Sequence, residues 1–360
     1  MSNVFPRSFG DRAASGRGKV FRIYAVVVAM NVGAWIWALV AFHNYPTLLG
    51  TAFLAYGFGL RHAVDADHIA AIDNVTRKLM QEGKRPVAVG FFFSLGHSTV
   101  VVLASIAVAA TAVAFKDQLE SFRAVGGIVG TSISAAFLFL IAVINVFILM
   151  NVYKAFRRVK KGGGFSDEEL AALLSAKDGF FARMLRPLFR MMERSWHMYP
   201  LGFLFGLGFD TATEIGLLSI SAAEASAGLP IWSILAFPAL FTAGMTLIDT
   251  TDSILMLGAY GWAFVKPIRK LYYNMTITFV SVVVAVIVGG IEALGLIGDK
   301  FAPTGVLWDV VNSLNDNFGT LGYLIIVIFV VSWIVAIGIY RLKGYNQLEI
   351  LASRSSPALR

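Results

Sequence analysis

The amino-acid sequence predicts an all-α polytopic integral membrane protein, and its composition is the first evidence for this class. The 360 residues are 57% hydrophobic and 14% charged, with a mean hydropathy of +0.72. Soluble chains carry about 25% charged residues. Uncharged stretches of about 20 to 30 residues recur, and each can cross a hydrocarbon core of roughly 30 Å as a helix. The sequence has no cysteine, which excludes disulfides, thiolate metal sites and iron–sulfur clusters.

Eight apolar segments are predicted to cross the bilayer. They cover residues 22–42, 47–72, 87–114, 125–153, 198–224, 231–264, 271–297 and 318–340. The predicted organisation is a basic tail, helices one to four, a cytoplasmic loop, helices five to eight and a second tail, at residues 1–21, 22–153, 154–197, 198–340 and 341–360. Within the loop, arginine alternates with apolar residues, as in an amphipathic helix that lies on an anionic membrane surface.

Lysine and arginine are distributed unequally between the two sides of the predicted bundle. With the N-terminus inside, 26 of the 30 basic residues fall in the tails and inner loops, and Lys116, Arg123 and Lys300 fall outside. Such an excess marks the cytoplasmic side of membrane proteins. We therefore expect a multi-pass protein of the cytoplasmic (inner) membrane with both termini in the cytoplasm. The positive charge then reflects orientation in a lipid bilayer, and no nucleic-acid partner is expected.

Two sequence echoes indicate an internal repeat. The run FGL at 58–60 recurs at 205–207, 147 residues later, and FSLG at 93–96 is echoed by FTAG at 241–244, 148 residues later. The same offset superposes the fourth segment on the seventh. An odd number of crossings separates the corresponding helices, so we expect a 3+3 inverted repeat of segments two to four and five to seven. Such repeats place the substrate near the bilayer midplane, between the halves.

Ionisable residues are concentrated in the second, third, fifth and sixth segments. Seven are carboxylic acids: Asp65, Asp67, Asp73, Asp210, Glu214, Asp249 and Asp252. One such group exposed to the middle of a bilayer costs about 2.5 to 3.5 kcal/mol. The acids are therefore expected to face the protein interior, water or a bound cation. Asp73 and Asn74 fall where the second segment is expected to leave the membrane, and there they are expected to end the helix.

The second segment carries the strongest candidate metal site. Helical spacing places His62 beside Asp65 and Asp65 beside His68, and a break at the preceding glycines, Gly59 among them, would turn Asp67 inward. Two imidazoles with a carboxylate suit nickel, cobalt or zinc, whereas magnesium and calcium prefer oxygen ligands and copper(I) prefers sulfur. We therefore predict a transition-metal site at these residues, with a structural network or a proton relay as the alternative.

Other segments supply further candidate ligands or pathway residues. His97 of the third segment could add a third nitrogen, or it could hydrogen-bond between helices. A second set could complete a coordination sphere, accept protons that metal binding releases, or serve only as structural partners. This set is Asp210, Thr211, Glu214, Asp249 and Asp252. Arg61 could neutralise Asp65 when the site is empty, or form a purely structural ion pair.

Four sequence runs together resemble the nickel/cobalt transporter (NiCoT) family. They are RHAVDADHIAAIDN, FSLGHSTVV, LGFDTATEIGLL and GMTLIDTTD. The resemblance implies an eight-helix permease that imports Ni²⁺, Co²⁺ or both with high affinity. It also implies that His62, Asp67 and His68 are essential, and it places His97, Asp210, Glu214, Asp249 and Asp252 in the family's motifs. The efflux branch of the family carries a histidine-rich inner loop, whereas loop 154–197 has only His197, which favours uptake.

The energy source is expected to lie outside this chain. The sequence has no Walker A motif, so we expect neither bound ATP nor a resident cofactor. A divalent cation gains about 4.6 kcal/mol per 100 mV on entering a negative interior, twice the single-charge value, so the membrane potential could drive uptake. Zinc or manganese transport and metal export are the alternatives within the transporter class. A cation channel is a more remote alternative. So is an intramembrane metal-dependent hydrolase, because this sequence has no HExxH motif.

Overall fold

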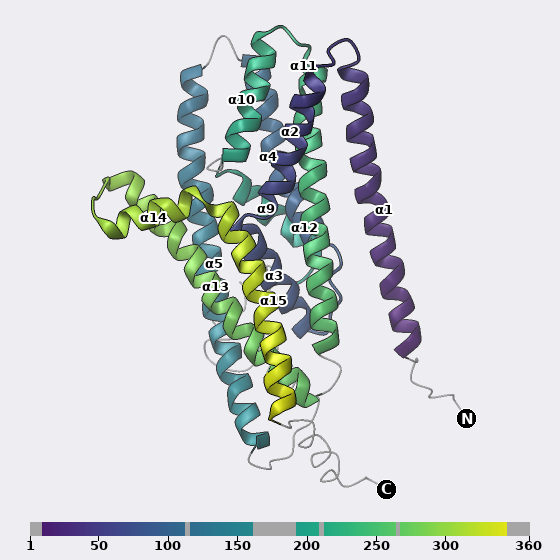
Figure 1. Cartoon of the computed structure of the whole chain (residues 1–360), viewed down its shortest axis with the longest axis vertical. Helices are drawn as coiled ribbons and strands as arrows, with labels where there is room; N and C mark the ends of the chain where they lie inside the picture. The colour runs from purple at the N-terminus through teal and green to yellow at the C-terminus, as the bar shows by residue number, and fades with distance from the viewer. Residues whose placement is uncertain (1–8, 112–115, 161–191, 209–211, 264–266, 344–360) are drawn as a thin grey trace.

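The structure, a computed structural model, describes residues 9–111, 116–160, 192–208, 212–263 and 267–343. Every secondary-structure element within these ranges is helical (Figure 1). The elements are α1 (Phe9–Ala41), α2 (Leu48–His62), α3 (Ala66–Gln81), α4 (Val89–Thr111), α5 (Lys116–Lys160), η1 (Ser195–His197), α9 (Met198–Gly206), α10 (Ala212–Ser226), α11 (Ile231–Ile234), α12 (Ala236–Ala263), α13 (Pro267–Phe301), α14 (Val306–Asp316) and α15 (Phe318–Leu342). The amphipathic helix predicted for the loop falls mainly on 161–191, outside the described residues.

Six helical runs in the described part of the chain are long and apolar enough to cross a membrane. They are Arg17–Ala41, Val89–Ala110, Gly127–Arg158, Ile231–Gly261, Leu271–Phe301 and Thr320–Leu342. These runs coincide with six of the eight predicted segments and confirm an all-α, multi-pass membrane protein. The second and fifth predicted segments are each formed by two shorter helices, α2 with α3 and α9 with α10.

The break between α2 and α3 lies in the middle of the second predicted segment. The helix α2 ends at His62, and α3 begins at Ala66 after Asp65, whose backbone is extended with φ −64° and ψ 148°. The preceding glycines, which the sequence indicated could permit a break, are not where the helix breaks. Gly59 lies inside α2, where an added Cβ would come 2.1 Å from the carbonyl oxygen of Phe241 on α12. This glycine therefore serves close helix packing.

Helix α3 also extends beyond the predicted end of the second segment. Asp73 and Asn74 were expected to end the helix, but α3 continues to Gln81 and both side chains are buried. Arg77 and Lys78, which the charge pattern assigned to an inner loop, lie in the same helix and are 0% and 5% exposed. The added turns are stable because their polar side chains find partners on other helices, which the sequence pattern does not show.

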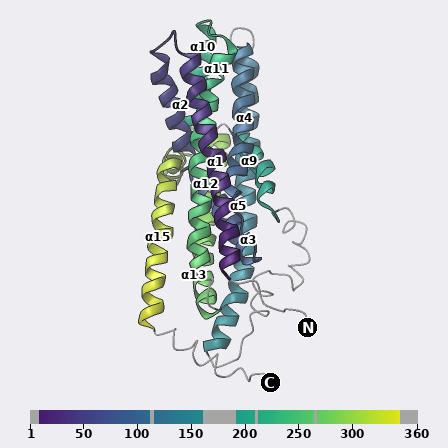
Figure 2. The same ribbon diagram turned by 90° about the vertical axis from the view of Figure 1, so that its right-hand side faces the viewer.

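The packing of the described helices follows the predicted repeat. Helix α2 packs against α12, α9 packs against α4, α4 meets α12, and α5 meets α13. Gly244 approaches the backbone of Tyr56, and Gly96, at the corresponding position, approaches the backbone of Tyr199. In both views, α2 lies above α3 whereas α9 lies below α10 (Figures 1 and 2). The two broken segments therefore run in opposite directions, which supports an inverted relation between the halves.

Exposed basic residues gather near one end of the bundle. Helix α1 begins and α15 ends at the lower end in Figures 1 and 2. Exposed basic residues lie in the chain segments near this end: Arg17, Lys19, Lys84, Arg85, Lys154, Arg157, Arg341 and Lys343. Helix α14, which the sequence did not predict, projects sideways from the bundle between α13 and α15 (Figure 1).

Candidate metal site

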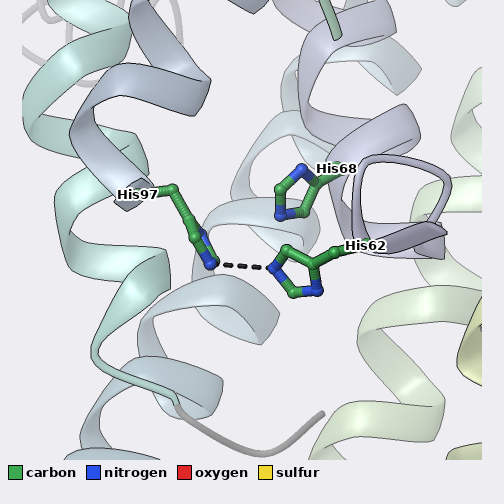
Figure 3. Close-up of side chains that lie close together, drawn as sticks. All are labelled: His62, His68 and His97. Atoms are coloured by element: carbon green, nitrogen blue, oxygen red, sulfur yellow. Dashed lines mark hydrogen bonds between the residues drawn. The ribbon is translucent and has the colours of Figure 1, made fainter. Parts of the chain in front are cut away.

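Three buried histidines meet beside the break in the second segment. His62 ends α2, His68 lies in the first turn of α3, and His97 comes from the middle of α4 (Figure 3). His62, His68 and His97 are 2%, 0% and 3% exposed, respectively. One nitrogen from each ring lies within 4.8 Å of the others, so the three residues could hold a single metal ion.

The break in the helix is what brings His62 and His68 together. Six steps of about 100° along an unbroken helix would rotate the second side chain by about 240° relative to the first. The extended backbone at Asp65 replaces that rotation, and the two ring centroids lie 4.7 Å apart. The rings are shielded by Phe93 and Phe241, whose centroids lie 4.8 Å from His68 and 5.5 Å from His62. The local chain geometry thus builds a buried nitrogen cluster inside the bundle.

The two nitrogens of each ring face different surroundings. His62 Nε2 lies 2.8 Å from His97 Nε2, while His62 Nδ1 lies 2.9 Å from Asp65 Oδ2 (Figure 3). His68 Nδ1 lies 3.3 Å from Asp249 Oδ2, and His68 Nε2 has no hydrogen-bond partner among the described residues. A carboxylate that holds one ring nitrogen while the other faces the ion is the usual environment of a metal-ligating histidine. His62 and His68 both have it.

Glu214 lies beside the point where the ring nitrogens of His62 and His97 converge. Its Oε1 atom is 2.9 Å from His97 Nε2 and 3.9 Å from His62 Nε2. Ligand atoms about 2.1 Å from an ion, at right angles to one another, lie about 3 Å apart. The spacing of these three atoms is therefore compatible with a common ion. Glu214 is in the first turn of α10, directly after Thr213, whose hydroxyl lies 3.2 Å from His62 Nδ1.

The remaining predicted site residues occupy different positions around the cluster. Asp67 is partly exposed in the first turn of α3, within electrostatic range of His62. Asp252 lies one turn from Asp249 on α12 and interacts with it electrostatically. Arg61 is exposed, and Asp65 forms its ion pair with His62, so the structure does not pair this arginine with Asp65. Asp210 and Thr211 lie outside the described residues.

Sequence reasoning missed a buried polar group farther along α3 from the site. Arg77 is fully buried on α3, and Tyr260 of α12 donates a hydrogen bond to Asp73. The four-residue spacing of Asp73 and Arg77 is a signal for neighbours on one helix face. The predicted second segment ends before Arg77, so the sequence alone does not place the two residues on one helix.

The fold and the site define a class of protein. Several carboxylates surround the three imidazoles, and a divalent transition metal suits both the negative charge of these acids and the nitrogen–oxygen donor set. A buried site at a broken helix between two inverted halves is the arrangement of a membrane carrier. The chain is therefore a multi-pass membrane transporter with a candidate metal site.

Comparison with known proteins identifies the family. The chain belongs to the NicO family, described as high-affinity nickel-transport protein, whose model matches residues 48–339. It is 62% identical over 336 residues to a high-affinity nickel transport protein of Cupriavidus necator, covering 93% of this chain and 95% of the relative. The nickel transporter NicT of Mycobacterium tuberculosis is 44% identical, with 91% and 89% covered.

A third relative is named for a different metal. The cobalt transport protein NhlF of Rhodococcus rhodochrous is 41% identical over 350 residues, covering 95% of this chain and 96% of the relative. No solved structure matches the chain. These findings confirm the resemblance to nickel/cobalt transporters, and membership of a transporter family excludes the hydrolase alternative.

Proposed function

We propose that this protein takes up Ni²⁺, and also Co²⁺, across the cytoplasmic membrane by binding the ion at the cluster of His62, His68 and His97. The observation that carries the proposal is the convergence of three buried ring nitrogens with the Glu214 carboxylate inside a membrane bundle. The relatives named for nickel and cobalt transport support the cargo. The carboxylates behind His62 and His68 orient the rings and favour cation binding.

The direction of transport follows from the orientation that we propose. The start of α1 and the end of α15 lie at one end of the bundle, near most of the exposed basic residues (Figure 1). The excess of lysine and arginine favours a cytoplasmic position for this end. The ion then enters from the opposite end and moves towards a negative interior, with about 4.6 kcal/mol available per 100 mV. ATP is not required within this chain.

Uptake of radiolabelled nickel into proteoliposomes with an inside-negative potential tests the proposal. We expect saturable uptake by wild type, loss of uptake in His62→Ala and His68→Ala, and normal uptake in His43→Ala, which removes an exposed histidine after α1. Excess unlabelled cobalt should compete. Competition by zinc or manganese instead of cobalt would point to another cargo, and uptake that is unchanged in both cluster variants would contradict the proposed site.

A further inference from the structure

Helix α3 is joined to α13 by three polar contacts below the metal site. Ser281 Oγ donates to Asp73 Oδ2 at 2.8 Å, Arg77 Nη1 donates to Thr278 Oγ1 at 2.9 Å, and Gln81 Nε2 donates to Asn274 Oδ1 at 2.7 Å. The α3 members are four residues apart, so they lie along one face of the helix. All six residues are buried. We call these contacts the polar ladder.

Arg77 is the central member of the polar ladder and its only cation. Its guanidinium is 0% exposed, and Nη2 donates to Asn74 Oδ1 at 2.8 Å, which also accepts from Asn145 Nδ2 at 2.7 Å. Asp73 lies within electrostatic range of Arg77 and accepts a hydrogen bond from Tyr260. An ionisable side chain inside a membrane protein is costly, and such groups commonly mark ion pathways.

The polar ladder lies between the metal site and the end of the bundle that we assign to the cytoplasm. Helix α3 carries His68 in its first turn and runs from there towards that end (Figure 1). It meets α12 at two levels, through His68 with Asp249 and through Asp73 with Tyr260. Ser253 is buried on the same face of α12, four residues after Asp249 and seven before Tyr260. Ser253 therefore marks the stretch between the site and the ladder.

The charges along this stretch define a route and a barrier. Asp249 and Asp252 interact with each other, and Asp252 interacts with Asp73, so carboxylates extend from the site to the ladder. They attract a cation, whereas the Arg77 guanidinium beyond them repels one. An ion that left the site along α3 would meet Arg77 and its hydrogen-bond partners. Water entering with the ion could then replace each broken hydrogen bond.

We propose that Arg77, held by Asp73 and the rest of the polar ladder, is the inner gate that separates the loaded metal site from the cytoplasm. This inference rests on the proposed function. Arg77 is a positioning residue that acts on the exit of the ion and does not bind it. Because α3 carries both the His68 and the Asp73 contacts to α12, a shift of α3 relative to α12 alters the metal site and the gate together.

Thiol accessibility can test the gate, because the chain has no cysteine of its own. A single Ser253→Cys reporter is labelled with a positively charged, membrane-impermeant methanethiosulfonate applied to the cytoplasmic face of inside-out vesicles. The labelling rate of this reporter is compared in two backgrounds. One is the otherwise unaltered chain, and the other carries both Asp73→Asn and Arg77→Gln. The double variant removes both charges, so neither is left unpaired. The matched control is Ser105→Cys, which is equally buried on α4 towards the opposite end.

We expect labelling of the Ser253→Cys reporter to become about tenfold faster, or more, in the double variant, while the control reporter stays protected. Equilibrium dialysis should show nickel affinity within about twofold of wild type, since the metal site is left intact. Tyr260→Phe removes the hydroxyl that donates to Asp73 and should accelerate labelling by a smaller factor. This variant replaces the double variant in the test if the double variant does not fold.

Protection of the Ser253→Cys reporter in the folded variants would overturn the gate, and so would equal acceleration at both reporters, which indicates general loosening. Loss of nickel binding in the double variant would also overturn it, because the ladder would then be part of the site's structure. Labelling requires no transport. Failure of the proposed function would appear as absent nickel uptake by wild type, independently of the labelling result.

Discussion

The arrangement around His62 leads to a quantitative prediction for Asp65→Asn. Asp65 Oδ2 lies 2.9 Å from Nδ1 of His62, on the side of the ring away from His97. Asparagine keeps the size and an acceptor oxygen but removes the negative charge. Loss of a carboxylate behind a ligating histidine costs about 10-fold to 100-fold in metal affinity, which corresponds to about 1.4 to 2.7 kcal/mol. We expect the dissociation constant for Ni²⁺ to rise by that factor.

Equilibrium dialysis of purified protein against Ni²⁺ measures this effect directly. Glu214→Gln should weaken binding more than Asp65→Asn, because Glu214 Oε1 lies among the metal-facing nitrogens. Asp309→Asn, which neutralises an exposed acid on α14, is the matched control and should bind like wild type. Unchanged nickel affinity in Asp65→Asn, with a wild-type melting temperature, would refute the role assigned to the His62–Asp65 contact. Weaker binding in the control variant would refute the charge argument.

Three further predictions concern packing and ligand linkage. Gly96→Ala should abolish stable folding, because the added Cβ would lie 1.9 Å from the carbonyl oxygen of Tyr199; Gly258→Ala, with no atom within 4 Å, should melt like wild type. Nickel at about 100 times its dissociation constant should stabilise the fold by about 2.7 kcal/mol, seen as a raised melting temperature. That increase should disappear in His97→Ala and when a chelator is added, and its persistence in either case would contradict the site.

The membrane spans could be predicted because the bilayer imposes length and apolarity on the sequence. All six candidate spans in the described part of the chain coincide with apolar segments predicted from the sequence. The break at Asp65 could not be located, because it follows no glycine or proline and depends on contacts of His62 and His68 with other helices. The extension of α3 to Gln81 was hidden for a similar reason. Its polar residues look like a loop until their partners on α13 are known.

The candidate site could be predicted in composition but not in arrangement. Histidines and acids inside apolar segments are costly and therefore conspicuous, so His62, His68 and His97 were identifiable from position alone. Which neighbours each ring nitrogen would face could not be predicted. Asp65 contacts the Nδ1 side of the His62 ring, whereas Glu214, which was expected to complete a coordination sphere, accept protons or serve as a structural partner, lies beside the converging Nε2 atoms of His62 and His97. Which side of an imidazole faces an ion is decided by helices far apart in sequence.

The paired helix breaks have an electrostatic consequence for the empty transporter. Helices α3 and α10 each begin near the site and carry an acid in the first turn, Asp67 and Glu214. The backbone dipoles give a helix N-terminus about half a positive charge and a C-terminus about half a negative charge. The starts of α3 and α10 therefore offset part of the negative charge of these acids, while the end of α2 at His62 favours an arriving cation. A departing ion leaves behind carboxylates that the backbone already partly balances, which eases its release.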